Sequence, residues 1–195
     1  MPQPQSKTRL TILTTADRLF SRRGIQAVGV DEIAREAGFT KRTLYYHFPT
    51  KDDLIAAWLD YTSALTAPPA ALEEMAPEAA IMAMFGGLAK TLSNGYRGCP
   101  FILTAAELVG ASPAIADVVS RHKQARRAWF AHTLERGGIP SKRAMTTAER
   151  LMVLWEGAWA SSVVFGDGSP IKAAQDMASA VLAEAYSPAA SNPQG

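Results

Sequence analysis

Hydrophobic residues recur along most of this chain at intervals of three and four, which is the period of an α-helix buried on one face. No stretch alternates between hydrophobic and polar residues for long enough to predict a β-strand. We therefore predict an all-α protein of about nine helices. They are expected near residues 8–23, 30–37, 41–47, 51–67, 78–93, 101–109, 113–136, 146–165 and 170–186.

Polar residues and a glycine mark where several of these helices begin and end. Ser6 and Thr40 stand where N-cap residues are expected, and Gly24 follows the first helix. Thr50 and Asp53 have the spacing of a capping box, with Asp in place of the usual Glu or Gln. These local signals predict the boundaries of the first four helices.

A change in composition divides the chain into parts. Short helices fill the first 50 residues, whereas longer, alanine-rich helices follow residue 70. Turn residues interrupt the pattern around 93–95, 110–113, 137–140 and 166–170. We predict a domain of three short helices at 1–50, a connecting helix at 51–67, a larger helical domain at 68–187 and a disordered tail at 188–195. The first five residues are also expected to be disordered.

The composition is that of a globular protein. Of 195 residues, 48% are hydrophobic and 19% are charged, and a chain of this length can bury a sizeable core without a metal or a disulfide. The single cysteine, Cys99, has no internal partner for a disulfide. The first residues, MPQPQSKTR, lack the continuous apolar run that is typical of a signal peptide, and no hydrophobic run of about 18 residues occurs. We expect a cytoplasmic protein that spans no membrane and needs no cofactor.

The small excess of positive charge is concentrated near the N-terminus. The chain has 20 Lys and Arg against 18 Asp and Glu. Residues 1–60 hold nine of these basic residues and seven of the acidic ones, so they carry the whole surplus. This charge is too small to indicate nucleic-acid binding by itself, but it directs attention to the first third of the chain.

The second and third expected helices have the arrangement of a helix-turn-helix. They are joined by the short turn Gly38-Phe39. In the later helix, Leu44 and Phe48 lie four residues apart and are expected to face the core. The other positions carry basic, hydroxyl and aromatic side chains, which bind DNA phosphates and base edges. We therefore predict that this helix contacts DNA.

Residues 12–59 resemble the DNA-binding domain of the TetR family of bacterial transcriptional regulators. The resemblance is carried by the following positions: Gly24, DEIA at 31–34, Ala37-Gly38, TLYYHF at 43–48, and Lys51. The segment GCPF at 98–101 also resembles a motif in one branch of the family. The chain departs from the family at Gly29, where Ser or Thr is usual, so one hydroxyl that could bind phosphate is absent.

The resemblance implies a homodimeric, ligand-responsive repressor that binds a palindromic operator in double-stranded DNA and is released by a small-molecule effector. It also assigns DNA contacts to particular residues. These are Thr40, Lys41, Arg42, Thr43, Tyr45, Tyr46, His47 and Lys51. Sequence specificity is expected to rest mainly on Lys41, Arg42 and Tyr45.

The larger domain is expected to hold both the effector and the dimer interface. Aromatic residues with a few polar groups favour a small-molecule pocket. The candidates are Trp58, Met82, Phe85, Phe101, Glu107, His122, Trp129, Trp155 and Trp159. A helix at 146–165 that is apolar on two faces needs two partners, and one of them is expected to be a second subunit. The expected interface residues are Met152, Trp159, Val163, Ile171, Met177, Val181 and Leu182. Ordinary core packing within one subunit is the alternative for both sets.

Two further expectations concern the longer helices. The helix at 113–136 presents a stripe formed by Ile115, Val118, His122, Ala125, Trp129 and Thr133, and its basic run at 121–127 is expected to be a solvated face. The helix at 51–67 is the expected path of the signal. Tilting it would change the separation of the two recognition helices, which must be about 34–36 Å to reach successive major grooves.

Three alternatives stay open at this point. A transcriptional activator of the same family would carry the same motifs. An architectural DNA-binding protein would use the same basic helix without an effector or a preferred operator. An enzyme would need Cys99 as nucleophile with His122 or His132 as base. The sequence disfavours the enzyme, because it has no glycine-rich phosphate loop and no metal-spaced cluster.

Overall fold

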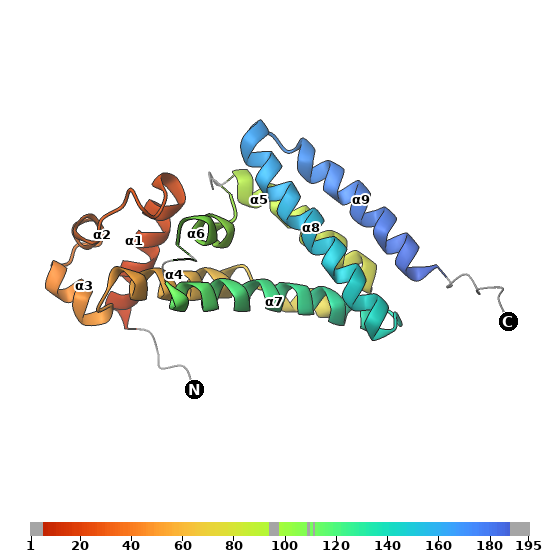
Figure 1. The fold of residues 1–195 in the computed structure, drawn as a ribbon, viewed down its shortest axis with the longest axis horizontal. Coiled ribbons are helices and arrows are strands. Elements are labelled where there is room, and N and C mark those ends of the chain that lie inside the picture. The colour runs from red at the N-terminus through yellow and green to blue at the C-terminus, as the bar shows by residue number, and fades with distance from the viewer. Residues whose placement is uncertain (1–5, 94–97, 109, 111, 188–195) are drawn as a thin grey trace. The chain divides into compact units, whose positions relative to one another are not determined.

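A computed structural model describes residues 6–93, 98–108, 110 and 112–187. Those residues form nine α-helices and one short 3₁₀ helix, with no strand among them (Figure 1). The elements are α1 (Lys7–Arg23), α2 (Val30–Glu36), α3 (Lys41–His47), α4 (Lys51–Leu65), η1 (Ala70–Glu74), α5 (Pro77–Ser93), α6 (Pro100–Leu108), α7 (Pro113–Arg136), α8 (Ser141–Phe165) and α9 (Ser169–Tyr186). The predicted all-α class is confirmed. The ends at 1–5 and 188–195, expected to be disordered, and positions 94–95 of the first predicted turn lie outside the described residues.

The predicted caps are present. The Ser6 hydroxyl accepts a hydrogen bond from the Arg9 amide, and Thr50 and Asp53 form a reciprocal capping box at the start of α4. Gly24 ends α1 with a φ of +84°, and Gly38 has a φ of +77° in the turn after α2. These left-handed conformations favour glycine, because a Cβ atom would be strained there.

Two helix boundaries differ from the prediction. Helix α8 begins at Ser141, directly after Pro140, and not near residue 146. Ala144 in this added segment is fully buried, so packing against the rest of the protein extends the helix through a polar stretch. Helix α4 ends at Leu65, and the unpredicted helix η1 follows the two prolines after it.

The chain folds as two compact units. The first unit contains residues 1–67 and 93–124, and the second contains residues 68–92 and 125–195. Helix α7 therefore contributes residues to both units. The boundary after residue 67 coincides with the predicted start of the larger domain, whereas residues 93–124, which were predicted to belong to that domain, pack with the first unit.

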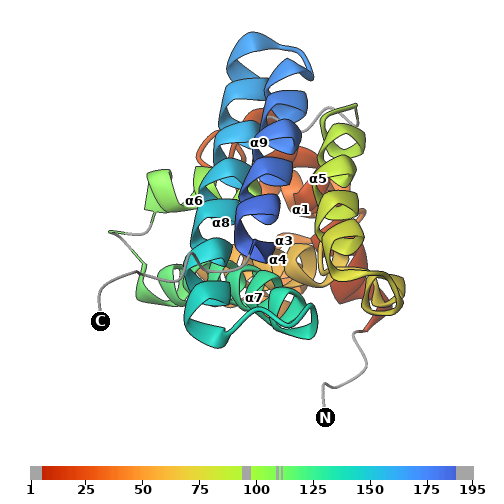
Figure 2. The same ribbon diagram turned by 90° about the vertical axis from the view of Figure 1, so that its right-hand side faces the viewer.

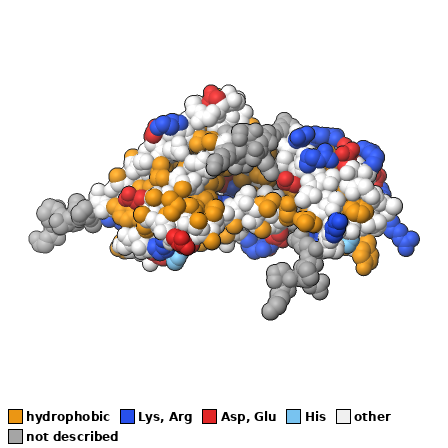
Figure 3. Space-filling model, turned by 180° about the vertical axis from the view of Figure 1, so that it is seen from behind, with side chains coloured by type: hydrophobic (Ala, Val, Ile, Leu, Met, Phe, Trp, Pro, Cys, Tyr) orange, Lys and Arg blue, Asp and Glu red, His pale blue; other side chains and the backbone are white. Residues whose placement is uncertain are grey.

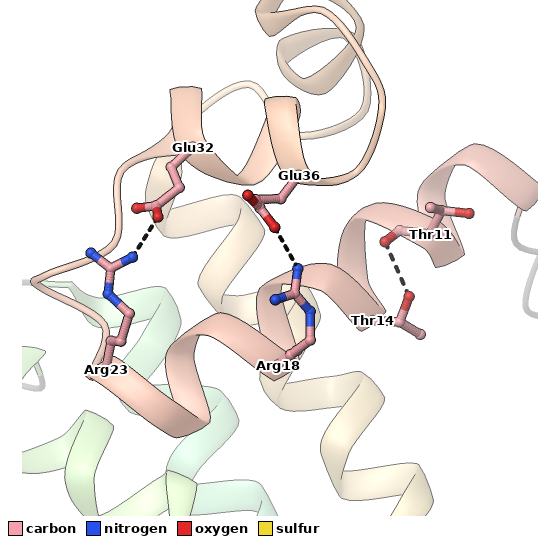
Figure 4. A network of polar contacts seen from close by, with 6 residues as sticks. All are labelled: Thr11, Thr14, Arg18, Arg23, Glu32 and Glu36. Atoms are coloured by element: carbon pink, nitrogen blue, oxygen red, sulfur yellow. Dashed lines mark hydrogen bonds and ion pairs between the residues drawn. The ribbon is translucent and has the colours of Figure 1, made fainter.

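The core of the first unit lies among α1, α2, α3 and α4. Hydrophobic side chains at its centre are fully or almost fully buried: Ile12, Leu13, Ile33, Leu44, Leu54 and Trp58. The Trp58 ring meets Phe20 edge to face with centroids 5.0 Å apart, and its indole N–H donates to Asp17 at 2.9 Å. Two ion pairs join α1 to α2, Arg18 with Glu36 at 2.9 Å and Arg23 with Glu32 (Figure 4). Together these contacts fix α2 and α4 against α1.

The core of the second unit is aromatic. Helices α8 and α9 run side by side (Figures 1 and 2). Phe85, Phe130 and Trp155 meet with ring centroids 5.4 to 6.2 Å apart.

No helix within the described ranges is long and apolar enough to cross a bilayer.

Candidate functional site

Helix α3 presents a polar face because its other face is anchored. Leu44 is fully buried and Phe48 nearly so, which fixes the rotation of the helix about its axis. The Thr40 hydroxyl accepts a hydrogen bond from the Thr43 amide at 3.1 Å and lies 2.9 Å from the Thr43 hydroxyl. Both threonines are therefore engaged at the start of the helix, where free backbone N–H groups also favour a phosphate.

The exposed face of α3 carries the residues that were expected to read DNA. Tyr46 is 84% exposed and does not pack on α1, and Tyr45 and Arg42 are also exposed. The Lys41 ammonium lies 2.8 Å from Asp31 Oδ1 and 5.9 Å from the centre of the Tyr45 ring. The hydrogen bond to Asp31 raises the pKa of Lys41 above its usual value. Lysine and arginine side chains gather over the α1–α3 end of the first unit, at the right of Figure 3.

The two remaining residues predicted to bind phosphate are partly covered. The His47 ring meets Tyr46 edge to face at 5.2 Å between centroids. The Lys51 ammonium donates to the backbone carbonyl of Ile25 at 2.9 Å. Burial lowers the pKa of Lys51, and the Glu107 and Asp52 carboxylates oppose that shift. Phosphate binding by Lys51 stays a prediction, since one of its three N–H donors is already used.

Gly29 occupies the N-cap position of α2, without a side-chain cap. A Cβ atom added there would meet nothing within 4 Å, and its φ of −87° is accessible to any residue. The structure therefore has room for the serine or threonine that is usual at this position in the resembled family.

The nine residues predicted to line an effector pocket are divided between the two units. Trp58, Phe101, Glu107 and His122 belong to the first unit, and the rest belong to the second. In the first unit, the His122 ring stacks on Phe101 with centroids 3.5 Å apart, and its Nδ1 lies 2.8 Å from the Ser63 hydroxyl. Trp58 and Glu107 line one small hollow there, together with residues of α1 and α6.

In the second unit, the predicted pocket residues Phe85, Trp155 and Trp159 are buried. Phe85 and Trp155 belong to the aromatic core described above. The Trp129 indole N–H donates to Glu73 at 3.0 Å. These contacts place the residues in a packed core or at its edge, so their role in effector binding stays a prediction.

The inward face of α7 differs from the predicted stripe in its second half. Ile115, Val118 and Thr133 are buried as expected, but Arg126 and Phe130 face inward where Ala125 and Trp129 were expected. Arg126 is only 6% exposed, so the expectation of a fully solvated basic run at 121–127 is wrong at this residue. The sequence contains an indication of this inward position, because Arg126 lies four residues before Phe130 and seven before Thr133, on one helical face.

The residues predicted for the dimer interface also separate into two groups. Trp159, Ile171 and Leu182 are already buried within the single chain, and their part in a dimer interface stays a prediction. Met177 is 57% exposed and Val163 is exposed, while Met152 and Val181 are half-buried. Phe165, which was not predicted, is 68% exposed. The predicted set therefore combines residues buried in the single chain with residues exposed on its surface.

Comparison with known proteins agrees with this arrangement. Residues 12–58 match the family of bacterial regulatory proteins of the tetR family, and residues 77–177 match the LmrA/YxaF-like C-terminal domain of transcriptional regulators. The uncharacterized HTH-type transcriptional regulator YxaF of Bacillus subtilis is 28% identical over 170 residues, which are 84% of this chain and 89% of YxaF.

Two further relatives extend the comparison. The crystal structure of SCO4454, a TetR-family transcriptional regulator from Streptomyces coelicolor, superimposes with a TM-score of 0.83 at 30% identity and covers 94% of this chain and 98% of that one. The HTH-type transcriptional activator FasR of Mycolicibacterium smegmatis is 43% identical over 56 residues, which are 29% of this chain and 26% of FasR. The chain therefore belongs to the TetR family of DNA-binding transcriptional regulators, with a C-terminal domain of the LmrA/YxaF-like type.

Proposed function

We propose that this protein is a ligand-responsive repressor that binds a palindromic operator as a homodimer and leaves the DNA when a small-molecule effector binds. The polar face of α3 carries the proposal. Arg42, Tyr45 and Tyr46 project from a helix whose opposite side is locked by Leu44 and Phe48. Arginine reads guanine edges, and tyrosine contacts phosphate oxygens or a thymine methyl group.

Operator recognition is tested by selecting genome fragments with the purified protein and titrating a recovered site against scrambled DNA at one fixed salt concentration. We expect a palindrome bound at least about 1,000-fold more tightly than scrambled DNA. Uniformly weak binding to both would contradict the proposal and favour an architectural role.

Exposed hydrophobic residues on α8 and α9 support a homodimer. Phe165 and Met177 lie on an open hollow of about 500 Å³ between the two helices. Small residues, including Gly157 and Ala173, also line it. Small residues allow close approach of a second helix pair, and a self-complementary patch is what a twofold dimer requires.

Helix α4 supports a route from the effector to the DNA. It begins at Lys51 and carries Ser63, whose hydroxyl lies 2.8 Å from His122 on α7. A ligand that moves α7 would therefore move α4 through this contact. Crystal structures with and without effector test the route, since an unchanged separation of recognition helices with a lowered operator affinity would contradict it.

Activation of transcription is the second candidate function, because the relative FasR is named as an activator. Fusing the recovered promoter to a reporter and deleting the regulator distinguishes the two, since reporter activity rises for a repressor and falls for an activator. An enzyme with Cys99 as nucleophile is not retained, because members of this family are DNA-binding regulators. A chromosomal operator would place the protein in the bacterial cytoplasm.

A further inference from the structure

Three elements of the first unit meet around the backbone of Gly24 and Ile25. These residues follow the end of α1, and the Lys51 ammonium at the start of α4 donates to the Ile25 carbonyl at 2.9 Å. From α6, the Glu107 carboxylate approaches the same backbone, because a Cβ atom built on Gly24 would lie 3.9 Å from Glu107 Oε1. Lys51, which is predicted to bind phosphate, and the carboxylate of Glu107 therefore approach two consecutive residues of the same backbone segment.

A small hollow lies between Glu107 and the end of α1. Gly24, Ile25 and Glu107 line it, and it encloses about 20 Å³, enough for one water molecule. The Ser21 hydroxyl, also on its wall, has no hydrogen-bond partner among the described residues. Glu107 itself is exposed at the rim, so its charge acts on Lys51 partly through solvent and is screened by salt.

We propose that Glu107 is a positioning residue for Lys51. The Glu107 carboxylate competes with the DNA phosphates for the Lys51 ammonium. The proposal rests on the proposed function, in which Lys51 contacts an operator phosphate. With the negative charge of Glu107 near the same backbone segment, Lys51 attracts a phosphate less than it would without Glu107. The position of α6 then sets how much of the Lys51 charge reaches the DNA, so Glu107 gives α6 a direct effect on operator affinity.

The proposal predicts the direction of change in two quantities, the pKa of Lys51 and the affinity for DNA. Glu107 raises the pKa of Lys51 against the lowering caused by burial, so the Glu107→Gln variant is expected to lower that pKa further. The same variant removes the competing charge and should strengthen DNA binding. Even a direct ion pair at the surface contributes only up to about 1 kcal/mol, so the expected gain in affinity is at most about fivefold.

The first measurement needs no DNA. Lysine side chains labelled with ¹³C at Cε are titrated by NMR in the full-length protein, and Lys51 is assigned from the Lys51→Arg variant. We expect the Lys51 pKa to fall in Glu107→Gln and to stay unchanged in the control Glu36→Gln, which removes a carboxylate paired with Arg18 in the same unit. An unchanged Lys51 pKa in Glu107→Gln would overturn the proposal.

The second measurement is a double-mutant cycle on operator affinity over a range of salt concentrations. Glu107→Gln should bind more tightly and with a steeper salt dependence when Lys51 is present, and this extra gain should disappear in the Lys51→Gln background. The gain from Glu36→Gln should be the same in both backgrounds. A Glu107→Gln gain that does not depend on Lys51 would overturn the competition. If the wild type shows no operator preference, the proposed function fails instead. The NMR titration then still tests whether Glu107 changes the pKa of Lys51.

Discussion

The guanidinium carbon of Arg126 lies 5.0 Å from the centre of the Trp155 ring, inside the core of the second unit. One of its terminal nitrogens also lies 3.9 Å from the Met84 sulfur. A cation over an aromatic face is stabilised by the ring quadrupole, more so when water is excluded. Its aliphatic stem adds hydrophobic contact. Arg126 is therefore a structural part of the core and not a member of a solvated basic face.

Replacing Arg126 by Ala is expected to lower the free energy of unfolding by about 2–4 kcal/mol, because a buried side chain and its interactions are lost together. Urea denaturation followed by tryptophan fluorescence, at one fixed protein concentration, measures this change. The control is Arg127→Ala, which removes a neighbouring, half-buried arginine that forms a 3.4 Å ion pair with Glu149. A loss of equal size in the two variants would contradict the structural role of Arg126.

The turn between α7 and α8 requires a residue without a Cβ atom at Gly137. A Cβ atom on Gly137 would lie only 2.1 Å from the Tyr186 hydroxyl and 2.9 Å from Cζ of the same ring. We expect Gly137→Ala to destabilise the protein by about 1–3 kcal/mol through overpacking, as measured by thermal unfolding. Gly87→Ala is the control, because its Cβ would meet nothing within 4 Å in α5, and alanine favours a helix. The cost of Gly137→Ala should shrink in a Tyr186→Leu background, and a cost that persists there would contradict this explanation.

Tyr186 also predicts how stability depends on alkaline pH. Burial raises the pKa of its phenol above the usual value of 10.0, and the Glu78 carboxylate raises it further. The folded state therefore holds this proton more tightly than the unfolded state does. The resulting stabilisation is complete below pH 10 and is lost as the pH rises through the folded-state pKa.

The difference in unfolding free energy between the wild type and Tyr186→Phe, followed from pH 8 to about pH 11.5, isolates this contribution. We expect the wild type to lose stability relative to the variant across the upper part of the range. Parallel curves for wild type and Tyr186→Phe would rule out the effect.

Arg42 is expected to contribute to the choice of base sequence. Arg42→Ala should reduce discrimination between operator and a site mutated at one base pair by about 1–3 kcal/mol, while affinity for random DNA falls less. Competition binding with single-base variants of the operator measures this. Arg35→Ala, which removes an exposed arginine from α2, should weaken binding to all sites about equally. Undiminished discrimination in Arg42→Ala would assign Arg42 to the phosphates.

The exposed residues of α8 and α9 predict the oligomeric state. Phe165→Glu combined with Met177→Glu should convert the proposed dimer to monomers, because like charges would be buried without partners in the interface. Sedimentation velocity measures the mass directly. Leu10→Glu changes an exposed hydrophobic residue of α1 and should leave the mass unchanged. A dimer that survives the double substitution would place the interface elsewhere.

Several features of this protein could be predicted from the sequence because their causes lie within one helical turn. Thr40 caps α3 through the amide three residues ahead, and the capping box of Thr50 and Asp53 has the same short reach. Leu44 and Phe48 set the inward face of a helix of only seven residues. In so short a helix the period leaves little freedom, so the exposed side of α3 was predicted correctly.

The tertiary structure alone decided which face a long helix buries and which distant groups meet. Neighbouring residues differ by about 100° around a helix, so a stripe displaced by one position exchanges Ala125 for Arg126. Only the surrounding helices select between them. The contacts of Lys51 with Ile25 and of Tyr186 with Gly137 join residues 26 and 49 positions apart. No local pattern encodes such contacts, because they depend on how separate helices pack, whereas caps, turns and the motif of the DNA-binding helix are set by neighbours along the chain.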